Sequence, residues 1–174
     1  MNINVASHNL TIRHERNVDA DAIRAVTAAA FPTQAEAALV DALRRQHAAV
    51  VSLVAEDGGQ VVGHVLFSPV TLDGSDQGML GLAPMAVSPA RQRQGIGSEL
   101  VRAGLDATRI CGAAGVVVVG HPAFYPRFGF VPALRFGLRC EYDVPDDVFM
   151  ALELIPGMLH RGGVVRYHRA FADL

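Results

Sequence analysis

The sequence predicts an α/β fold in a single domain, and two observations support this prediction. Stretches with the periodicity of helices and of strands alternate along the chain from residue 10 to residue 171. The 174 residues, of which 51% are hydrophobic and 18% charged, can bury one sizeable core but not two. No repeat and no linker rich in Pro, Gly or Ser divides the sequence. We therefore expect residues 1–174 to form one domain.

The first half of the chain is expected to begin with a strand and two helices and to continue into a hairpin. Pro32 separates the two helices, because proline cannot continue a helix. The turn Asp57-Gly58-Gly59 connects the two strands of the hairpin. The elements expected here are a strand over 10–16, helices over 18–31 and 33–47, and strands over 50–55 and 61–72.

The second half continues the alternation. The four consecutive valines 116–119 predict a strand that is buried on both faces. Pro84 cannot donate a hydrogen bond to a sheet, so it predicts a bulge or a locally opened edge, or else marks a plain edge strand. The expected elements are a strand over 79–87, a helix from 97 to about 111, a strand over 116–119, a short helix after Pro122, and strands over 148–154 and 164–171.

A basic, glycine-containing loop joins the strand that ends at Val87 to the next helix. Gly95 and Gly97 place no Cβ in the way of an anion, and the first N–H groups of the helix point toward it. Arg91 and Arg93 add positive charge. The loop lacks the Gly-Lys-Ser/Thr of a P-loop and the third glycine of a dinucleotide fingerprint. It predicts a pyrophosphate site; the alternative is a helix start preceded by a solvated turn.

A second motif, Gly-His-Pro-Ala-Phe-Tyr-Pro-Arg-Phe-Gly-Phe, follows the valine strand over 120–130. Together, Gln92-x-x-Gly95-x-Gly97 and Phe124-Tyr125-x-x-x-Gly129-Phe130 resemble the acyl-CoA signature of the GCN5-related N-acetyltransferases (GNAT). The sequence of residues 120–130 resembles that of the subgroup called YhbS-like predicted acetyltransferases. This similarity continues through 140–145 and 153–157 to the C-terminus.

The resemblance implies a fold and a co-substrate. The fold is a central, mostly antiparallel sheet flanked by helices, in which the fourth and fifth strands splay apart. Residues 10–135 would form the core, and 136–174 would complete the sheet and the acceptor site. Acetyl-CoA would place its pantetheine arm along the fourth strand, its pyrophosphate on the loop and its sulfur beside a tyrosine. The implied cofactor-binding residues are Met85, Ala86, Val87, Gln92, Arg93, Gln94, Gly95, Ile96, Gly97, Ser98 and Tyr125.

Tyr125 is the candidate general acid. Amine acylation requires that the amine lose a proton, that the oxyanion be held and that the thiolate leave, preferably protonated. A phenol, with a pKa of about 10, stays neutral at neutral pH and can donate to a sulfur whose thiol pKa is about 8.5. The alternative is a tyrosine that only packs beside Phe124 and Phe128.

The two motifs do not identify the general base that takes the amine proton. Many members of the family carry a glutamate on the fourth strand, but residues 79–84 contain no ionisable group. The candidates are His121, His64, Glu36 and Glu153, and each has a simpler role open to it. His121 could bond the pantetheine amide, His64 could be a buried sheet residue, and Glu36 has a capping-box spacing. We expect a water relay to His121, His64 or Glu36, or an amine that binds neutral.

Composition excludes several other classes. The net charge of −2 provides no basic field for nucleic acid. All 15 basic residues are arginines, so lysine chemistry is excluded, and the seven histidines show no metal-ligand spacing. Residues 1–8 lack a signal core and no apolar run could span a membrane. Cys111 and Cys140 have no disulfide framework and are expected in the core. These features predict a cytoplasmic protein without metal, nucleic-acid or membrane partners.

The sequence thus predicts an acetyl-CoA-dependent N-acyltransferase in which a primary amine attacks directly in a ternary complex. The acceptor stays open among small amines, antibiotics, peptide N-termini and protein lysines, and a homodimer stays open. The acidic segment 141–153 could line the acceptor site or form a solvated loop. The alternative function is a non-catalytic acyl-CoA-binding regulatory module, which would need the glycine loop but not Tyr125.

Overall fold

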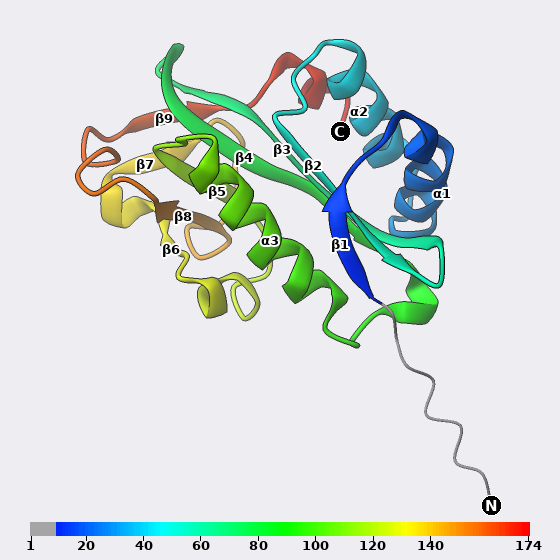
Figure 1. Ribbon diagram of the computed structural model, residues 1–174. Helices are drawn as coiled ribbons and strands as arrows, with labels where there is room; N and C mark the ends of the chain where they lie inside the picture. The colour runs from blue at the N-terminus through cyan, green and yellow to red at the C-terminus, as the bar shows by residue number, and fades with distance from the viewer. Residues whose placement is uncertain (1–9) are drawn as a thin grey trace, which may run out of the picture.

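The computed structural model describes residues 10–174, in which nine strands form one mixed sheet (Figure 1). The expectation about a signal segment in residues 1–8 lies outside this part of the chain. The strands are β1 Thr11–His14, β2 Val51–Asp57, β3 Gln60–Leu72, β4 Ser75–Val87, β5 Gly115–Val119, β6 Val131–Pro132, β7 Leu138–Cys140, β8 Phe149–Glu153 and β9 Gly163–Arg166. The α-helices are α1 Ala20–Ala30, α2 Ala35–Arg45 and α3 Ile96–Ile110.

The strand order is β1-β2-β3-β4-β5-β8-β6, and β9 pairs with the end of β3 and with β7. Only the pairs β4–β5 and β7–β9 are parallel; the other pairs are antiparallel. The predicted mixed, mostly antiparallel sheet flanked by helices is confirmed.

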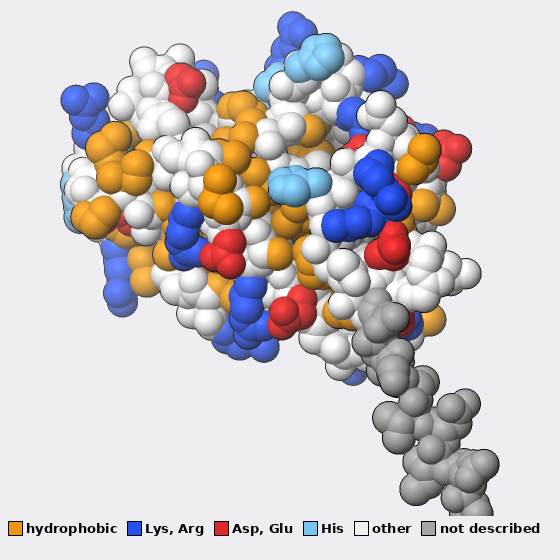
Figure 2. All heavy atoms as spheres, viewed as in Figure 1, with side chains coloured by type: hydrophobic (Ala, Val, Ile, Leu, Met, Phe, Trp, Pro, Cys, Tyr) orange, Lys and Arg blue, Asp and Glu red, His pale blue; other side chains and the backbone are white. Residues whose placement is uncertain are grey.

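The helices cover the two faces of the sheet. Along β3, Val65 and Phe67 pack in one cluster with Leu100 and Leu105 of α3, whereas Leu66 packs in another cluster with residues of α1 and α2. This separation follows from the alternation of side chains along a strand. Gly104 lets α3 approach closely, since a Cβ there would lie 2.4 Å from the Phe67 ring. Figure 2 shows acidic and basic side chains side by side over α3; they include the ion pairs Arg102–Glu99 and Arg109–Asp106.

β4 and β5 separate halfway along β4. Their parallel pairing runs from Met79 to Gly81 and then stops, although β4 continues to Val87. Around Pro84 the pairing of β3 with β4 is irregular. Val65 pairs with Met85 and Phe67 pairs with Leu82, so two residue steps along β3 correspond to three along β4. This irregularity is the bulge that Pro84 predicted. The β4 edge that faces away from β3 is therefore free of β5 over residues 85–87.

Three expectations need correction. The strand expected over 164–171 ends at Arg166, because His168 caps a 3₁₀ turn over Arg169–Asp173 by accepting from the Ala170 N–H at 3.3 Å. The helix expected after Pro122 is one 3₁₀ turn, Tyr125–Phe128. Cys111 is exposed after the end of α3 rather than buried in the core, and Cys140 is half-buried. No helix within residues 10–174 is long and apolar enough to cross a membrane.

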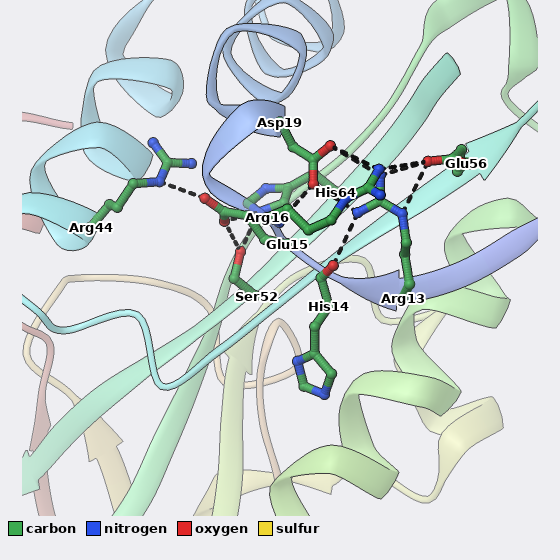
Figure 3. A network of polar contacts seen from close by, with 9 residues as sticks. All are labelled: Arg13, His14, Glu15, Arg16, Asp19, Arg44, Ser52, Glu56 and His64. Atoms are coloured by element: carbon green, nitrogen blue, oxygen red, sulfur yellow. Dashed lines mark hydrogen bonds and ion pairs between the residues drawn. The ribbon is translucent and has the colours of Figure 1, made fainter. Parts of the chain in front are cut away.

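A buried polar network fastens α2 to the sheet (Figure 3). The Glu15 carboxylate accepts hydrogen bonds from Arg44 of α2, at 2.6 Å, and from the Ser52 hydroxyl. His64 Nε2 lies 2.8 Å from Ser52 Oγ. Because the Ser52 hydroxyl donates to Glu15, Nε2 must carry the proton and donate to Ser52. The His64 side chain is 0% exposed.

The network sets two pKa values. Burial lowers the pKa of His64 and outweighs the opposite effect of the Glu15 carboxylate. Burial raises the pKa of Glu15, but the nearby His64 and the hydrogen bonds from Arg44 and Ser52 outweigh it and hold the value at about 2. His64 is therefore neutral and Glu15 charged at neutral pH.

We predict that the fold loses stability as the pH falls below about 6.5, the pKa of histidine in an unfolded chain. The unfolded chain then binds a proton at His64 that the folded chain does not. His64→Gln should reduce the slope of unfolding free energy against pH between about pH 6.5 and 5, where one proton contributes at most about 1.4 kcal/mol per unit. Chemical denaturation measures this slope, with the exposed His121→Gln as control. Equal slopes in the wild type and His64→Gln would contradict the assignment.

Candidate active site

A groove lies at the start of α3, between β4 and the turn Tyr125–Phe128. The cavity has a volume of about 480 Å³. It is lined by Met85, Val87, Arg91, Gln92, Arg93, Gly95, Gly97, Ser98, Phe124 and Arg127. A Cβ at Gly97 would lie 3.6 Å from Met85 and 3.7 Å from Phe124, so position 97 faces the groove. The free N–H groups of the first turn of α3 lie along the same segment. The donors and the open backbone suit an anion.

Local bonds fix the loop that precedes α3. Gly95 has a φ of +87°, a left-handed conformation that favours glycine. The Gln92 side-chain amide donates to the Val87 carbonyl at 3.1 Å. Arg91 forms an ion pair with Asp57 of the β2–β3 hairpin at 2.7 Å and donates to the Gln94 side chain at 3.0 Å. Arg91 therefore holds the loop, and its charge is balanced by Asp57.

The charge of the groove comes from Arg93 and Arg127. No hydrogen bond or ion pair holds the Arg93 side chain within the described part of the chain, residues 10–174. The Arg127 guanidinium lies 4.6 Å from the centre of the Phe124 ring and 3.4 Å from Ser98 Oγ. The sequence reasoning did not assign Arg127 to the site. In the sequence, the available signal for Arg127 was its position three residues after Phe124, within the second motif.

Tyr125 follows Phe124 of the groove wall, and its ring fits only because residue 120 is a glycine. A Cβ at Gly120 would lie 2.2 Å from Tyr125 Cε2, so only glycine at position 120 admits the ring without displacement. Phe124 and Phe130 contact the ring edge to face, with centroids 5.0 and 5.6 Å away. Tyr125 is 7% exposed, and burial raises its pKa to about 12. The phenol is therefore protonated at neutral pH.

A second cavity, of about 430 Å³, lies on the other side of the β4–β5 opening. We call it the acceptor cavity, for the role that we propose for it below. Met85 lines both this cavity and the groove, so the two spaces adjoin at the unpaired edge of β4. Val119, at the end of β5, is 42% exposed and contributes to its wall, so the prediction of a strand buried on both faces is wrong at this residue. The cavity is lined by Phe31, Glu36, Leu39, Leu82, Ala83, Pro84, Met85, Val119, Tyr125, Tyr142, Val144, Tyr167, Phe171 and Leu174.

The candidate bases occupy four different environments. Glu36 lies in the wall of the acceptor cavity together with Tyr125. His64 is enclosed in the network with Glu15 and Ser52, and it lines neither cavity. His121 is exposed in the loop after β5 and also lines neither. Glu153 accepts the Leu159 N–H at 3.0 Å, and that hydrogen bond lowers its pKa. Of these four residues, only Glu36 lines a described cavity that Tyr125 also lines.

The acidic C-terminal segment contributes apolar side chains to the acceptor cavity. Tyr142 and Val144 belong to its wall, whereas Glu141, Asp143 and Asp146 line a neighbouring hollow. The Glu141 carboxylate accepts the Tyr167 N–H at 2.5 Å. Within residues 10–174, no group of three or more His, Cys, Asp or Glu side chains is arranged to hold a metal ion.

The fold and the site define an N-acetyltransferase. Residues 48–132 match the family model of the acetyltransferase (GNAT) domain. The chain is 40% identical over 164 residues to the uncharacterized N-acetyltransferase YhbS of Escherichia coli K12, covering 93% of this chain and 98% of the relative. The chain belongs to the GNAT family, as its two motifs predicted.

Two crystal structures of relatives agree with the whole chain. The first is YhbS from Escherichia coli in complex with CoA, with a TM-score of 0.91, 39% identity, and coverage of 95% of this chain and 93% of that one. The second is a GNAT acetyltransferase from Brucella melitensis in complex with acetyl-CoA, with a TM-score of 0.81, 43% identity, and coverage of 94% and 99%.

We predict that Gly120→Ala lowers turnover about as much as loss of the Tyr125 hydroxyl, because the new methyl group must displace the ring. A double-mutant cycle in kcat tests this: Gly120→Ala should add little to Tyr125→Phe. Thermal unfolding and acetyl-CoA titration of each variant separate this effect from misfolding. Additive losses in kcat would show that Gly120 acts independently of the hydroxyl.

Proposed function

We propose that this protein transfers the acetyl group of acetyl-CoA to a primary amine by direct attack in a ternary complex. The observation that carries the proposal is the meeting of the groove and the acceptor cavity at Met85, beside Tyr125. A thioester that enters along the groove reaches the acceptor cavity where β4 and β5 part. The relatives bound to CoA and acetyl-CoA, which cover almost the whole chain, support this assignment.

Backbone groups supply most of the proposed co-substrate site. The edge of β4 over Met85, Ala86 and Val87 is not paired with β5, and the pantetheine amides bond there as an added strand would. The pyrophosphate lies on the loop 92–98, where N–H groups and the helix dipole favour negative charge. Arg93 and Arg127 neutralise the phosphates.

In the proposed reaction, the amine nitrogen attacks the thioester carbonyl carbon, a C–N bond forms and the C–S bond breaks. Tyr125 donates a hydrogen bond to the departing sulfur. Its pKa of about 12 exceeds that of a thiol, about 8.5, so the phenol stabilises the thiolate mainly as a donor rather than by losing its proton. The amine proton passes to Glu36, directly or through water.

The C-terminal segment, residues 136–174, belongs to the same proposed domain as the rest of the chain. Strands β8 and β9 pair with β5 and β3, and Tyr142, Tyr167 and Phe171 supply the wall of the acceptor cavity. Residues 136–174 therefore complete both the sheet and the site, and the chain acts as one domain.

Gly97→Glu should weaken acetyl-CoA binding by about a hundredfold, because a side chain and a negative charge would enter the groove beside the phosphates. Gly97→Ala should cost far less, since its Cβ would meet nothing closer than 3.6 Å. Isothermal titration calorimetry with acetyl-CoA measures both. Unchanged affinity in a folded Gly97→Glu protein would place the pyrophosphate elsewhere.

Tyr125→Phe should retain acetyl-CoA affinity and lower kcat about a hundredfold, the usual contribution of a positioned acid or donor. Release of free CoA thiol in a screen of amines gives the rate. An unchanged kcat would remove Tyr125 from the chemistry. A wild-type protein that binds acetyl-CoA and acetylates no amine would favour the alternative, a non-catalytic binding module.

A further inference from the structure

The lining of the acceptor cavity is mostly apolar and holds one charged side chain. Among the described side chains that line it, only Glu36 bears a carboxylate and none is basic. Hydrophobic side chains, including Phe31, Leu39 and Leu82, form most of the remaining surface. A cationic group placed at Glu36 is neutralised, whereas a second cation finds no second acidic side chain in this described lining.

One wall of the cavity is aromatic. The Tyr167 ring lies between Tyr142 and Phe171, with centroids 5.9 and 5.0 Å away. Gly81 of β4 makes room for this arrangement, since a Cβ there would lie 2.9 Å from Tyr167 Cε1. Aromatic rings at these distances offer a flat apolar surface against which another ring can pack.

The geometry points to an acceptor that is a primary monoamine with an apolar, preferably aromatic, body; this inference rests on the proposed function. The ammonium group pairs with Glu36 before it loses its proton, and the body packs against Tyr142, Tyr167 and Phe171. Polyamines would bury at least one unpaired cation, and a lysine-containing peptide would bury polar backbone groups against an apolar wall. Both classes are therefore disfavoured.

A longer acyl chain is the competing occupant, because the cavity adjoins the groove at Met85. Glu36 argues against it. Its carboxylate accepts a hydrogen bond from Thr33 Oγ1 at 3.3 Å, but an acyl chain would offer the charge itself no counterion, whereas an ammonium group supplies one.

The first test measures binding without chemistry. The protein loaded with CoA, which cannot transfer an acetyl group, is titrated by calorimetry with 2-phenylethylamine, spermidine and a short lysine-containing peptide. We expect 2-phenylethylamine to bind at least tenfold more tightly than the other two. Equal or tighter binding of spermidine or the peptide would overturn the inference.

Variants test whether the Glu36 carboxylate binds the ammonium group of the acceptor. Glu36→Gln should weaken 2-phenylethylamine binding at least tenfold, and Glu36→Asp should restore part of it. Asp146→Asn, which removes a carboxylate from the neighbouring hollow, is the control and should change binding less than twofold. Val144→Glu adds a second carboxylate to the acceptor cavity and should raise the affinity for spermidine relative to 2-phenylethylamine at least tenfold. An unchanged affinity for 2-phenylethylamine in Glu36→Gln, or an unchanged ratio of the two affinities in Val144→Glu, would overturn the assignment.

Thiol release then separates the two proposals. If 2-phenylethylamine binds as expected but no amine releases thiol from acetyl-CoA, the proposed function fails and the binding preference stands. If spermidine or the peptide is acetylated with the higher kcat/KM, the proposed function stands and the acceptor class is wrong. If octanoyl-CoA is a better donor than acetyl-CoA and competes with the amine, the acyl chain occupies the cavity and the inference fails.

Discussion

The end of the β4–β5 pairing at Gly81 and Val117 is the constraint on which the site depends. Beyond this point β4 continues through the bulge at Pro84 to Val87 and keeps its bonds to β3. The β4 edge beyond this point has no strand partner, so its backbone groups are open to hydrogen bonds from a ligand. The same divergence gives the edge access to the groove on one side and to the acceptor cavity on the other. In the proposed function, binding and chemistry therefore meet at one interruption of the sheet.

Three glycines allow close packing around this interruption because they have no side chain. Gly104 brings α3 onto Phe67, Gly120 admits the ring of Tyr125, and Gly81 admits the ring of Tyr167. None of these three has a left-handed backbone; each is needed because an aromatic side chain occupies the place of its Cβ. The rings at Gly104 and Gly81 come from distant parts of the sequence, so tertiary packing positions α3 and the aromatic wall, whereas the ring at Gly120 comes from Tyr125 of the same loop.

Local patterns predicted most of the fold and the outline of the site. Helix and strand periodicity placed α1, α2, α3 and the hairpin, and two motifs indicated the groove and Tyr125. The sequence did not reveal properties that depend on contacts between residues far apart in the chain. Arg91 and Arg93 look alike in sequence, but Arg91 is balanced by Asp57. The difference between the candidate bases His64 and Glu36 likewise depends on distant neighbours: Ser52 and Glu15 enclose His64, whereas Glu36 lines the acceptor cavity.

The two halves of the site differ in how they recognise a ligand. The groove combines backbone N–H groups, an unpaired strand edge and open glycines with the side chains of Arg93 and Arg127. The acceptor cavity is made of side chains from segments far apart in sequence, around 31–39, 142–144 and 167–174. A few substitutions there alter its charge and shape while the sheet and the groove stay intact. In the proposed function, this division allows one scaffold to keep a common donor and change its acceptor, because the surface proposed to select the amine contributes little to the site proposed for the thioester.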